Sequence, residues 1–377
     1  MNFIVFSDDW GRHPSSCEHI FRKLLDEHRI IWVNTIGYRS PKLNWYDVKR
    51  SFEKLASWFS PSKDDHIIAE HPNLLVISPI IIPYNSFKIV RLLNKWLMDR
   101  ALSTAIREFN FEQYVLLSSH PTVGDYYKTH ESMIKIYYCV DDFTVMPGVN
   151  KKLIGKLEAE LTEQSDIILY TARALKDKFS NHPNCHYLPH GVDYDHFTDL
   201  KPSRELDNIK KPIIGFFGML SEWVDINLIK EVAQSKPEWS FLFIGNTDID
   251  LSPYRGIDNL IFHGPVPYKE LPSVAKQFDI GMIPFQVNQL TKAVNPLKFL
   301  EYACLGLPVI STELPELRQY DEHVTFISDK GSFIQAVDEL LAGDGDDKQK
   351  SRIKLAFDNS WLSRSRRVLE IISNFSR

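Results

Sequence analysis

The segment 288–312 carries the side chains best suited to bind a phosphorylated ligand. Lys298 and Glu301 are three residues apart, so a helix would place both on one face. The lysine offers a cation for a phosphate, and the glutamate offers a carboxylate that accepts hydrogen bonds from two vicinal hydroxyl groups. Pro296 suits the first turn of that helix, where free amides attract an anion. The alternative is an amphipathic helix whose lysine and glutamate form a solvated ion pair, and the spacing alone does not separate the two.

Two adjacent carboxylates, Asp141 and Asp142, follow the apolar run 134–140, where a strand would end. A carboxylate at such a place can take the proton of an attacking hydroxyl group. In the alternative, one of the two caps the turn after the strand. Neighbouring residues point to opposite faces of a strand, which argues against one metal ion held by both.

Three further polar residues follow predicted strands in the first half of the chain. Ser15 and Ser16 end the loop 7–16 after the first strand, and either can cap the next helix. His120 follows another strand, and for an isolated histidine a structural role is favoured over a catalytic one.

Three histidines spaced four residues apart do not predict a metal site. The spacing of four would place the three side chains on one face of a helix, but two prolines interrupt any such helix. The histidines are His182, His186 and His190, and the prolines are Pro183 and Pro189.

Short apolar runs alternate with helical patterns along the chain, which predicts parallel sheets covered by helices on both faces. The predicted strands are 3–6, 30–33, 114–117, 134–139, 167–170, 213–217, 240–244, 260–262, 280–283, 309–311 and 324–327. The predicted helices are 17–27, 87–109, 150–164, 226–235, 271–277, 296–304, 332–341 and a single long one from about 346. Two α/β domains joined by the polar linker 198–208 follow from this order. Ligands of such sheets bind beyond the carboxyl ends of the strands, where the polar residues above fall.

Composition excludes several classes of protein. The 377 residues favour two domains, and the net charge of −5 disfavours a nucleic-acid binder. No strand is followed by GxGxxG or by GxxxxGK and a hydroxyl residue, which disfavours a dinucleotide dehydrogenase and a P-loop NTPase. The four cysteines are widely spaced, and no signal peptide or membrane span is visible, so we expect a cytoplasmic protein.

One span has a positive net charge, although the net charge of the whole chain is negative. Residues 39–107 hold 11 basic and six acidic residues, a net charge of +5, with several aromatic residues among them. Basic and aromatic helices suit the headgroup layer of an anionic membrane, so the span is a candidate for peripheral membrane contact. A solvated helix face over a core stripe is the equally favoured alternative.

The motif NPLKFLEYACLGLPVIST (295–312) resembles the donor-site element of two-domain, B-type glycosyltransferases, especially family 4 and related bacterial exopolysaccharide and teichuronic-acid transferases. LPHGVDYDHF (188–197), IIGFFGMLSEWVDINLI (213–229) and YYCVDDF (137–143) are similar to other runs of that family. The resemblance implies two Rossmann-like parallel-sheet domains facing each other across a cleft, the GT-B architecture. It implies an acceptor domain 1–200, a nucleotide-sugar domain 201–360, and a terminal helix 361–377 that packs back on the first domain.

The resemblance also implies roles for individual residues of the second domain. Glu301 matches the glutamate that binds the nucleotide ribose, and Lys298 matches a lysine that contacts donor phosphate. The loop whose amides face the diphosphate corresponds to Asn295, Pro296 and Leu297, and the glycine loop near the nucleotide corresponds to Gly218 and Met219. The chain departs from the family at Ala293, where a first glutamate is usual, and at 221–225, where an Arg…Lys pair is missing.

In the first domain, Asp142 aligns with the catalytic aspartate of an inverting glucuronosyltransferase of similar architecture, with Asp141 as the second candidate. In a retaining enzyme the donor phosphate takes the proton instead, and Asp142 only orients substrate. Ser15, Ser16 and His120 become candidates for the acceptor side.

The resemblance therefore predicts a metal-independent glycosyltransferase of surface polysaccharide assembly that needs no cofactor. Its donor is a UDP-, GDP- or dTDP-linked sugar, and its acceptor is a saccharide, free or linked to a polyprenyl diphosphate lipid. Two alternatives are a sugar-nucleotide epimerase on the same fold and a non-catalytic scaffold subunit of a polysaccharide complex. Ala293 in place of glutamate is the feature that favours the scaffold.

Overall fold

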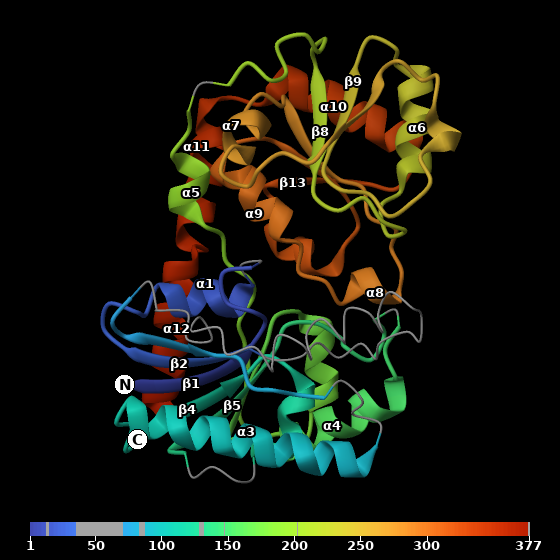
Figure 1. The fold of residues 1–377 in the computed structure, drawn as a ribbon. Coiled ribbons are helices and arrows are strands. Elements are labelled where there is room, and N and C mark those ends of the chain that lie inside the picture. The colour runs from blue at the N-terminus through green and yellow to red at the C-terminus, as the bar shows by residue number, and fades with distance from the viewer. Residues whose placement is uncertain are drawn as a thin grey trace. The chain divides into compact units, whose positions relative to one another are not determined.

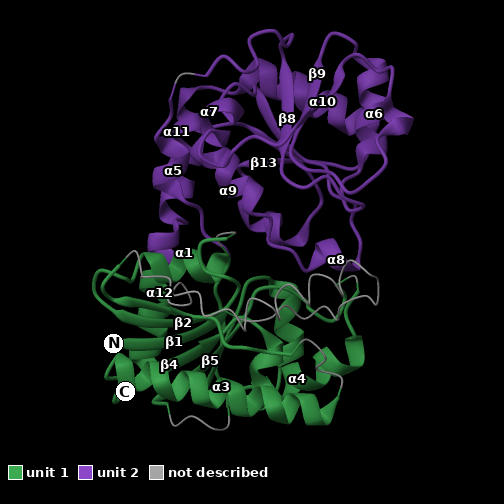
Figure 2. Cartoon of the chain, in the orientation of Figure 1, with its two compact units in different colours: residues 1–189, 365–377 green, residues 190–364 purple. Residues whose placement is uncertain are grey.

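The chain folds into strands and helices that alternate in sequence (Figure 1). The computed structural model describes residues 1–12, 15–34, 71–82, 87–127, 132–146, 148–201 and 203–375. The chain forms two compact units, which we call unit 1 (residues 1–189 and 365–377) and unit 2 (residues 190–364) (Figure 2). The sequence suggested limits at about 200 and 360, whereas the units change at 189/190 and 364/365.

Unit 1 contains a seven-stranded sheet in the order β3-β2-β1-β4-β5-β6-β7, and all of its neighbouring strands are parallel. Its strands are β1 (Asn2–Ser7), β2 (Arg29–Asn34), β3 (Leu74–Ile77), β4 (Val115–Ser118), β5 (Ile134–Cys139), β6 (Ile167–Tyr170) and β7 (Cys185–Tyr187). The inner strands are buried on both faces, which is why they read as continuous apolar runs. Two strands were not predicted: β3, and the partly exposed edge strand β7.

Helices lie on both sides of this sheet, with α1 and α3 on opposite sides (Figure 1). They are α1 (Ser16–Arg22), α3 (Lys88–Glu108) and α4 (Lys151–Gln164), with the short 3-10 helices η1 (Pro121–Asp125) and η3 (Arg173–Phe179). Asn150 caps α4 through a hydrogen bond from the Leu153 amide.

Unit 2 contains a six-stranded parallel sheet in the order β10-β9-β8-β11-β12-β13. Its strands are β8 (Ile213–Phe217), β9 (Ser240–Ile244), β10 (Leu260–Gly264), β11 (Ile280–Ile283), β12 (Val309–Thr312) and β13 (Val324–Ile327). Its α-helices are α5 (Tyr194–Thr198), α6 (Ile226–Ser235), α7 (Leu271–Ala275), α8 (Gln289–Lys292), α9 (Leu297–Cys304), α10 (Lys330–Gly343) and α11 (Asp346–Asp358), and its 3-10 helices are η4 (Ser252–Tyr254) and η5 (Pro315–Tyr320). The prediction of two Rossmann-like parallel sheets is confirmed.

The prediction of one long terminal helix from 346 is wrong. The chain forms α11 and then α12 (Trp361–Phe375), with a break at Asn359 and Ser360. The Val192 amide donates to the Asn359 carbonyl (3.2 Å), and the Trp361 amide donates to the Val192 carbonyl (3.0 Å). These backbone groups pair with another segment instead of continuing the helix. The local sequence pattern does not predict that pairing.

Each sheet has one place where the strand order reverses. In unit 1 the chain runs outward from β1 through β2 to β3 and then returns to β4 on the other side of β1. In unit 2 it runs from β8 through β9 to β10 and returns to β11. The loops after the two strands at a switch point diverge, which leaves room for a ligand at their carboxyl ends. The segments that follow β1, β4, β8 and β11 are therefore where a site is expected.

Candidate functional site

Gly218 and Lys298 lie against each other at the switch point of unit 2. Gly218 directly follows β8 and has φ +133°, a backbone conformation that side chains with a Cβ rarely adopt. A Cβ built on Gly218 would lie 2.5 Å from Cε and 2.7 Å from Nζ of Lys298. The amino group thus lies directly against the backbone of the glycine loop, where a bound phosphate would find a cation.

The surroundings of Lys298 are aromatic and poorly hydrated. Its Nζ lies 5.3 Å from the centre of the Phe216 ring and 5.9 Å from that of Phe285. Burial lowers the pKa of Lys298, although the nearby charge of Glu301 partly opposes this. A cation in such surroundings interacts strongly with an anionic ligand that replaces the lost water.

Glu301 lies one turn further along α9, and burial raises its pKa to about 7 in spite of the lysine. In the part of the chain that the structure describes, no ion pair within 4.0 Å joins Glu301 to Lys298 or to another residue. The alternative of a solvated Lys–Glu pair is therefore not what the fold contains. Both charged groups are held near each other without neutralising each other, which suits a ligand with phosphates and hydroxyls.

Tyr302 fixes the position of α9 on the sheet. Its buried hydroxyl donates towards the carbonyls of Gly215 and Met282, each at 3.3 Å. A Cβ on Gly281 would lie 2.6 Å from Cγ of Tyr302, so the ring packs directly on the strand backbone. Because the tyrosine follows Glu301, this contact sets the direction in which the glutamate projects.

The other donor-side candidates surround this point to different degrees. Pro296 precedes α9 rather than beginning it, and no side chain caps the helix, so its first amides are open to an anion. Leu297 is the first helical residue, Asn295 is buried, and the Met219 side chain is 40% exposed beyond the glycine loop. Ala293 ends the short helix α8.

Tyr268 is a residue that the sequence analysis did not single out. Its ring stacks on His196 with centroids 4.1 Å apart and an interplanar angle of 19°, and the residue is 46% exposed. Partial burial raises the pKa of Tyr268, and the charge of Glu301 raises it further, which places the phenol near that carboxylate. The only signal in the sequence was the unassigned aromatic content.

The two adjacent aspartates of unit 1 have different surroundings. Asp142 accepts hydrogen bonds from the amide (3.0 Å) and the hydroxyl (2.6 Å) of Thr144 and pairs with Nζ of Lys178 (2.9 Å). Partial burial would raise its pKa, but these partners prevail and lower it. Lys178 also pairs with the buried Glu158 (2.8 Å), so Asp142 belongs to an internal network.

Asp141 has the opposite character. Burial, with a contribution from the charge of Asp142, raises its pKa to about 7. No hydrogen bond or ion pair from another described residue reaches its carboxylate. A carboxylate that titrates near neutral pH and is not already engaged can take a proton from a substrate.

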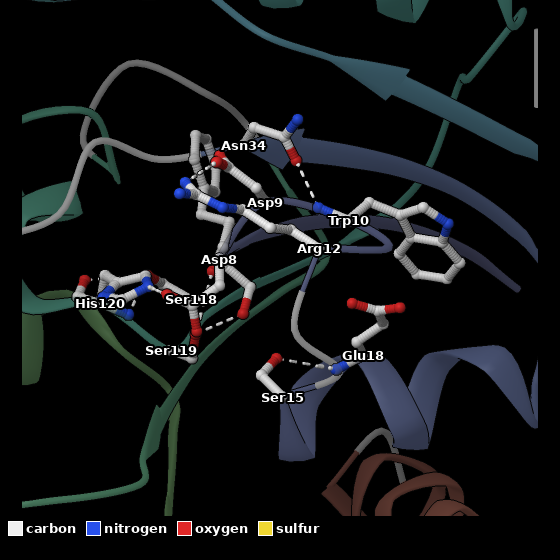
Figure 3. Close-up of polar contacts among 12 residues, drawn as sticks. Asp8, Asp9, Trp10, Arg12, Ser15, Glu18, Asn34, Ser118, Ser119 and His120 are labelled. Atoms are coloured by element: carbon white, nitrogen blue, oxygen red, sulfur yellow. Dashed lines mark hydrogen bonds and ion pairs between the residues drawn. The ribbon is translucent and has the colours of Figure 1, made fainter. Parts of the chain in front are cut away.

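The acceptor-side candidates gather at the switch point of unit 1 (Figure 3). The His120 Nε2 lies 3.2 Å from Oδ1 of Asp8, a residue that the sequence analysis missed. The Ser15 hydroxyl accepts a hydrogen bond from the Glu18 amide (3.3 Å) and caps α1, so it has a structural role, and Ser16 begins that helix. Asp8 and His120 meet because β1 and β4 pair side by side, a relationship that no local pattern reveals.

Helix α3 exposes a stripe of large apolar side chains. Ile89 is 81% exposed, Leu92 67% and Trp96 55%, at positions that share one face of the helix. Most of the aromatic residues predicted for membrane contact fall outside the described residues, namely Trp45, Tyr46, Phe52, Trp58 and Phe59. No helix among the residues described is long and apolar enough to cross a membrane.

No group of three or more histidine, cysteine, aspartate or glutamate side chains able to hold a metal ion occurs in the described ranges. The predicted independence of metal ions stays a prediction.

Comparison with known proteins points to one family. Residues 211–343 match the family of glycosyl transferases group 1. The putative teichuronic acid biosynthesis glycosyltransferase TuaH of Bacillus subtilis (strain 168) is 28% identical over 237 residues, which cover 58% of this chain and 60% of TuaH. The alignment thus spans less than two thirds of that relative.

Two solved structures share the whole fold at low identity. Sucrose-phosphate synthase from Thermosynechococcus elongatus superposes with a TM-score of 0.69 at 12% identity, over 99% of this chain and 98% of the enzyme. Anabaena HepE, solved in complex with UDP and glucose, superposes with a TM-score of 0.64 at 12% identity, over 98% and 99% of the two chains. We conclude that residues 211–343 of unit 2 are similar to the group 1 glycosyl transferases, and that the chain shares the two-sheet GT-B fold of the solved structures.

Proposed function

We propose that the chain transfers a sugar from a nucleoside diphosphate sugar to a hydroxyl group of a saccharide acceptor. The observation that carries the proposal is the contact of Lys298 with the Gly218 backbone, with an unpaired Glu301 one turn away at the same switch point. The diphosphate binds Lys298 and the amides at the start of α9, and the ribose hydroxyls bind Glu301. The exposed ring of Tyr268 offers a surface on which a base can stack.

Uracil is the base that we favour for the first experiment. Support comes from Anabaena HepE, which was solved with UDP and glucose and shares the fold. Calorimetric titration of the protein with UDP, GDP and dTDP tests this choice, and we expect UDP to bind most tightly. Glu301→Ala is expected to weaken that binding by about 1–3 kcal/mol, because the hydroxyl contacts are removed.

In the reaction, the acceptor oxygen forms a bond to the anomeric carbon while the bond from that carbon to the diphosphate oxygen breaks. The nucleoside diphosphate leaves with the electron pair, and Lys298 and the helix amides stabilise its charge. We assign the proton of the acceptor hydroxyl to Asp141, because Asp142 is already bound by Thr144 and Lys178. A single displacement of this kind inverts the anomeric configuration. If the acceptor oxygen instead attacks from the face that the diphosphate leaves, and a donor phosphate oxygen takes its proton, the anomeric configuration is retained.

We further propose that the acceptor belongs to a surface polysaccharide and is carried by a polyprenyl diphosphate lipid on the cytoplasmic face of the membrane. The relative TuaH supports the polysaccharide role. The α3 stripe supports membrane contact, because the helix also carries five basic and two acidic residues that complement an anionic surface.

Sedimentation with phosphatidylglycerol vesicles tests this contact. The triple variant Ile89→Ser/Leu92→Ser/Trp96→Ser should lose binding at low salt. Leu341→Ser/Phe357→Ser removes similarly exposed apolar side chains from unit 2 and is the matched control. If both variants bind the vesicles equally well, α3 is not the face that contacts the membrane.

The epimerase and the scaffold remain the competing functions. An epimerase would convert one nucleotide sugar into another without an acceptor, and a scaffold would bind or turn over none. Incubation with UDP-, GDP- and dTDP-sugars, with and without an acceptor, separates the three by their products. The same incubation with EDTA tests independence of metal ions, and we expect the rate of transfer to stay unchanged.

A further inference from the structure

The switch point of unit 1 contains a built polar site centred on Asp8 and His120 (Figure 3). Asp8 lies just after β1, and His120 lies just after β4, its parallel neighbour. The Oγ atoms of Ser7 and Ser119 are 2.7 Å apart, which ties the two strand ends together below the site. Both serines are buried, so this pair is internal.

His120 is held rigidly. Its amide donates to Oγ of Ser118 (3.1 Å), and the same hydroxyl donates to its carbonyl (2.9 Å). Its ring lies against Phe143, with centroids 5.9 Å apart, on the loop that also carries Asp141. Only 5% of the His120 side chain is exposed, so the imidazole acts on a ligand through its neighbours rather than directly.

Asp8 is exposed but anchored. Its side chain is 57% exposed, while Oδ1 lies 3.2 Å from Nε2 of His120. Its main-chain carbonyl accepts a hydrogen bond from the indole of Trp32 (2.9 Å). The carboxylate is therefore held in place by His120, while part of its surface stays open to a ligand at the end of the sheet.

We propose that Asp8 binds hydroxyl groups of the acceptor saccharide and that His120 is the positioning residue that orients it. The proposal rests on the proposed function, since it names the unit 1 group that holds the second substrate. A carboxylate can accept hydrogen bonds from two vicinal hydroxyls, and a fixed one loses little entropy when it does so. The contact of the His120 ring with Phe143 links Asp8 to the loop of Asp141, the proposed base.

The charge state of Asp8 agrees with this role. The hydrogen bond from His120 lowers the pKa of Asp8, against a smaller opposing effect of burial. Asp8 is thus ionised at neutral pH and accepts hydrogen bonds, whereas Asp141 has a pKa of about 7 and can exchange a proton. Two carboxylates whose pKa values differ in this way suit two different tasks.

The neighbouring residue offers a matched control. Asp9 is also partly exposed, but it pairs with Arg12 (3.4 Å) rather than with His120. Asp8→Asn and Asp9→Asn remove the same charge one residue apart. His120→Gln keeps a polar side chain but removes the imidazole that anchors Asp8.

The test measures binding of p-nitrophenyl glycosides of glucose, galactose, glucuronic acid and N-acetylglucosamine to the full chain by saturation-transfer NMR, and then transfer to the glycoside that binds. Asp8→Asn should raise the KM for that glycoside about tenfold or more, with kcat changed little. His120→Gln should raise it by a smaller factor. UDP affinity and thermal stability of the same preparations should match those of Asp9→Asn.

Equal acceptor KM values for Asp8→Asn and Asp9→Asn would overturn the proposal. So would a wild-type protein that binds none of the glycosides, or an Asp8→Asn variant that loses stability and UDP affinity in parallel with acceptor binding. Failure of the proposed function has a separate signature, because it would appear as absence of UDP binding and of UDP-sugar turnover in the wild-type protein.

Discussion

Lys298 occupies the space that a side chain at residue 218 would need, with Cε 2.5 Å from the position of a Cβ there. The glycine directly follows β8 and the lysine lies in α9, and these two elements are far apart in the sequence. In the proposed function, their contact joins the glycine loop beside the nucleotide to the cation that binds its phosphates. Any side chain larger than hydrogen at residue 218 would therefore have to displace Lys298.

Gly218→Ala should weaken UDP binding by about tenfold or more, because the new methyl group displaces Lys298 and the φ of +133° is strained for alanine. Calorimetry with UDP measures the effect. Gly256→Ala is the control, since Gly256 also has a positive φ (+81°) but nothing lies within 4 Å of its Cβ position. An equal loss of UDP affinity in both variants would mean that backbone strain, not the lysine, is responsible.

Lys298→Ala should weaken UDP binding by about 1.5–3 kcal/mol, the range for a hydrogen bond to a charged group. Lys292 lies at the end of α8 and is exposed, so Lys292→Ala removes the same charge outside the aromatic surroundings. We expect Lys292→Ala to change the affinity only slightly at physiological salt. A larger effect from Lys292 would shift the phosphate site towards α8.

Glu301→Gln should stabilise the protein at pH 8 and weaken UDP binding at the same time. The pKa of Glu301 is raised from 4.5 to about 7, so between these pH values the unfolded chain has lost a proton that the folded chain retains. Stability therefore falls as the pH rises through this window, and the charged state costs about 1–3 kcal/mol above it. Glutamine removes that cost. Thermal unfolding at pH 4.5 and pH 8 checks the sign, and a variant less stable than wild type at pH 8 contradicts it.

Asp141→Asn and Asp142→Asn should differ in kind. Asp141→Asn should lower kcat about 100-fold or more and abolish the rise of activity near pH 7, because the base is lost. Asp142→Asn should mainly lower the melting temperature, since it removes one carboxylate partner of Lys178 and costs about 1–3 kcal/mol. Rates across pH and thermal scans of both variants separate the roles. A greater loss of kcat in Asp142→Asn than in Asp141→Asn would instead identify Asp142 as the group that takes the proton.

The repeated apolar runs were sufficient to predict most strands, because a buried parallel strand must be apolar on both faces. They could not predict β7, whose residues at the sheet edge are only partly buried, nor the break before α12, which depends on Val192 pairing with residues far along the chain.

Only part of the candidate site could be predicted from local sequence patterns, because the rest depends on contacts between segments far apart in the chain. The spacing of Lys298 and Glu301 predicts that they share one helix face. The spacing does not predict that the two side chains form no ion pair with each other. Asp141 and Asp142 are equivalent in the sequence and differ only through Thr144 and Lys178. Asp8 becomes visible only once β1 and β4 are known to be neighbours.

The most direct measurement is product analysis by NMR after incubation of the full chain with nucleotide sugars and the glycoside acceptors. We expect one nucleoside diphosphate, UDP in our proposal, to be released together with an equal amount of a new glycoside. We also expect Glu301→Ala and Lys298→Ala to reduce both products strongly. Conversion of the nucleotide sugar into its epimer, or release of no nucleotide from any donor by the wild-type chain, would contradict the proposed function.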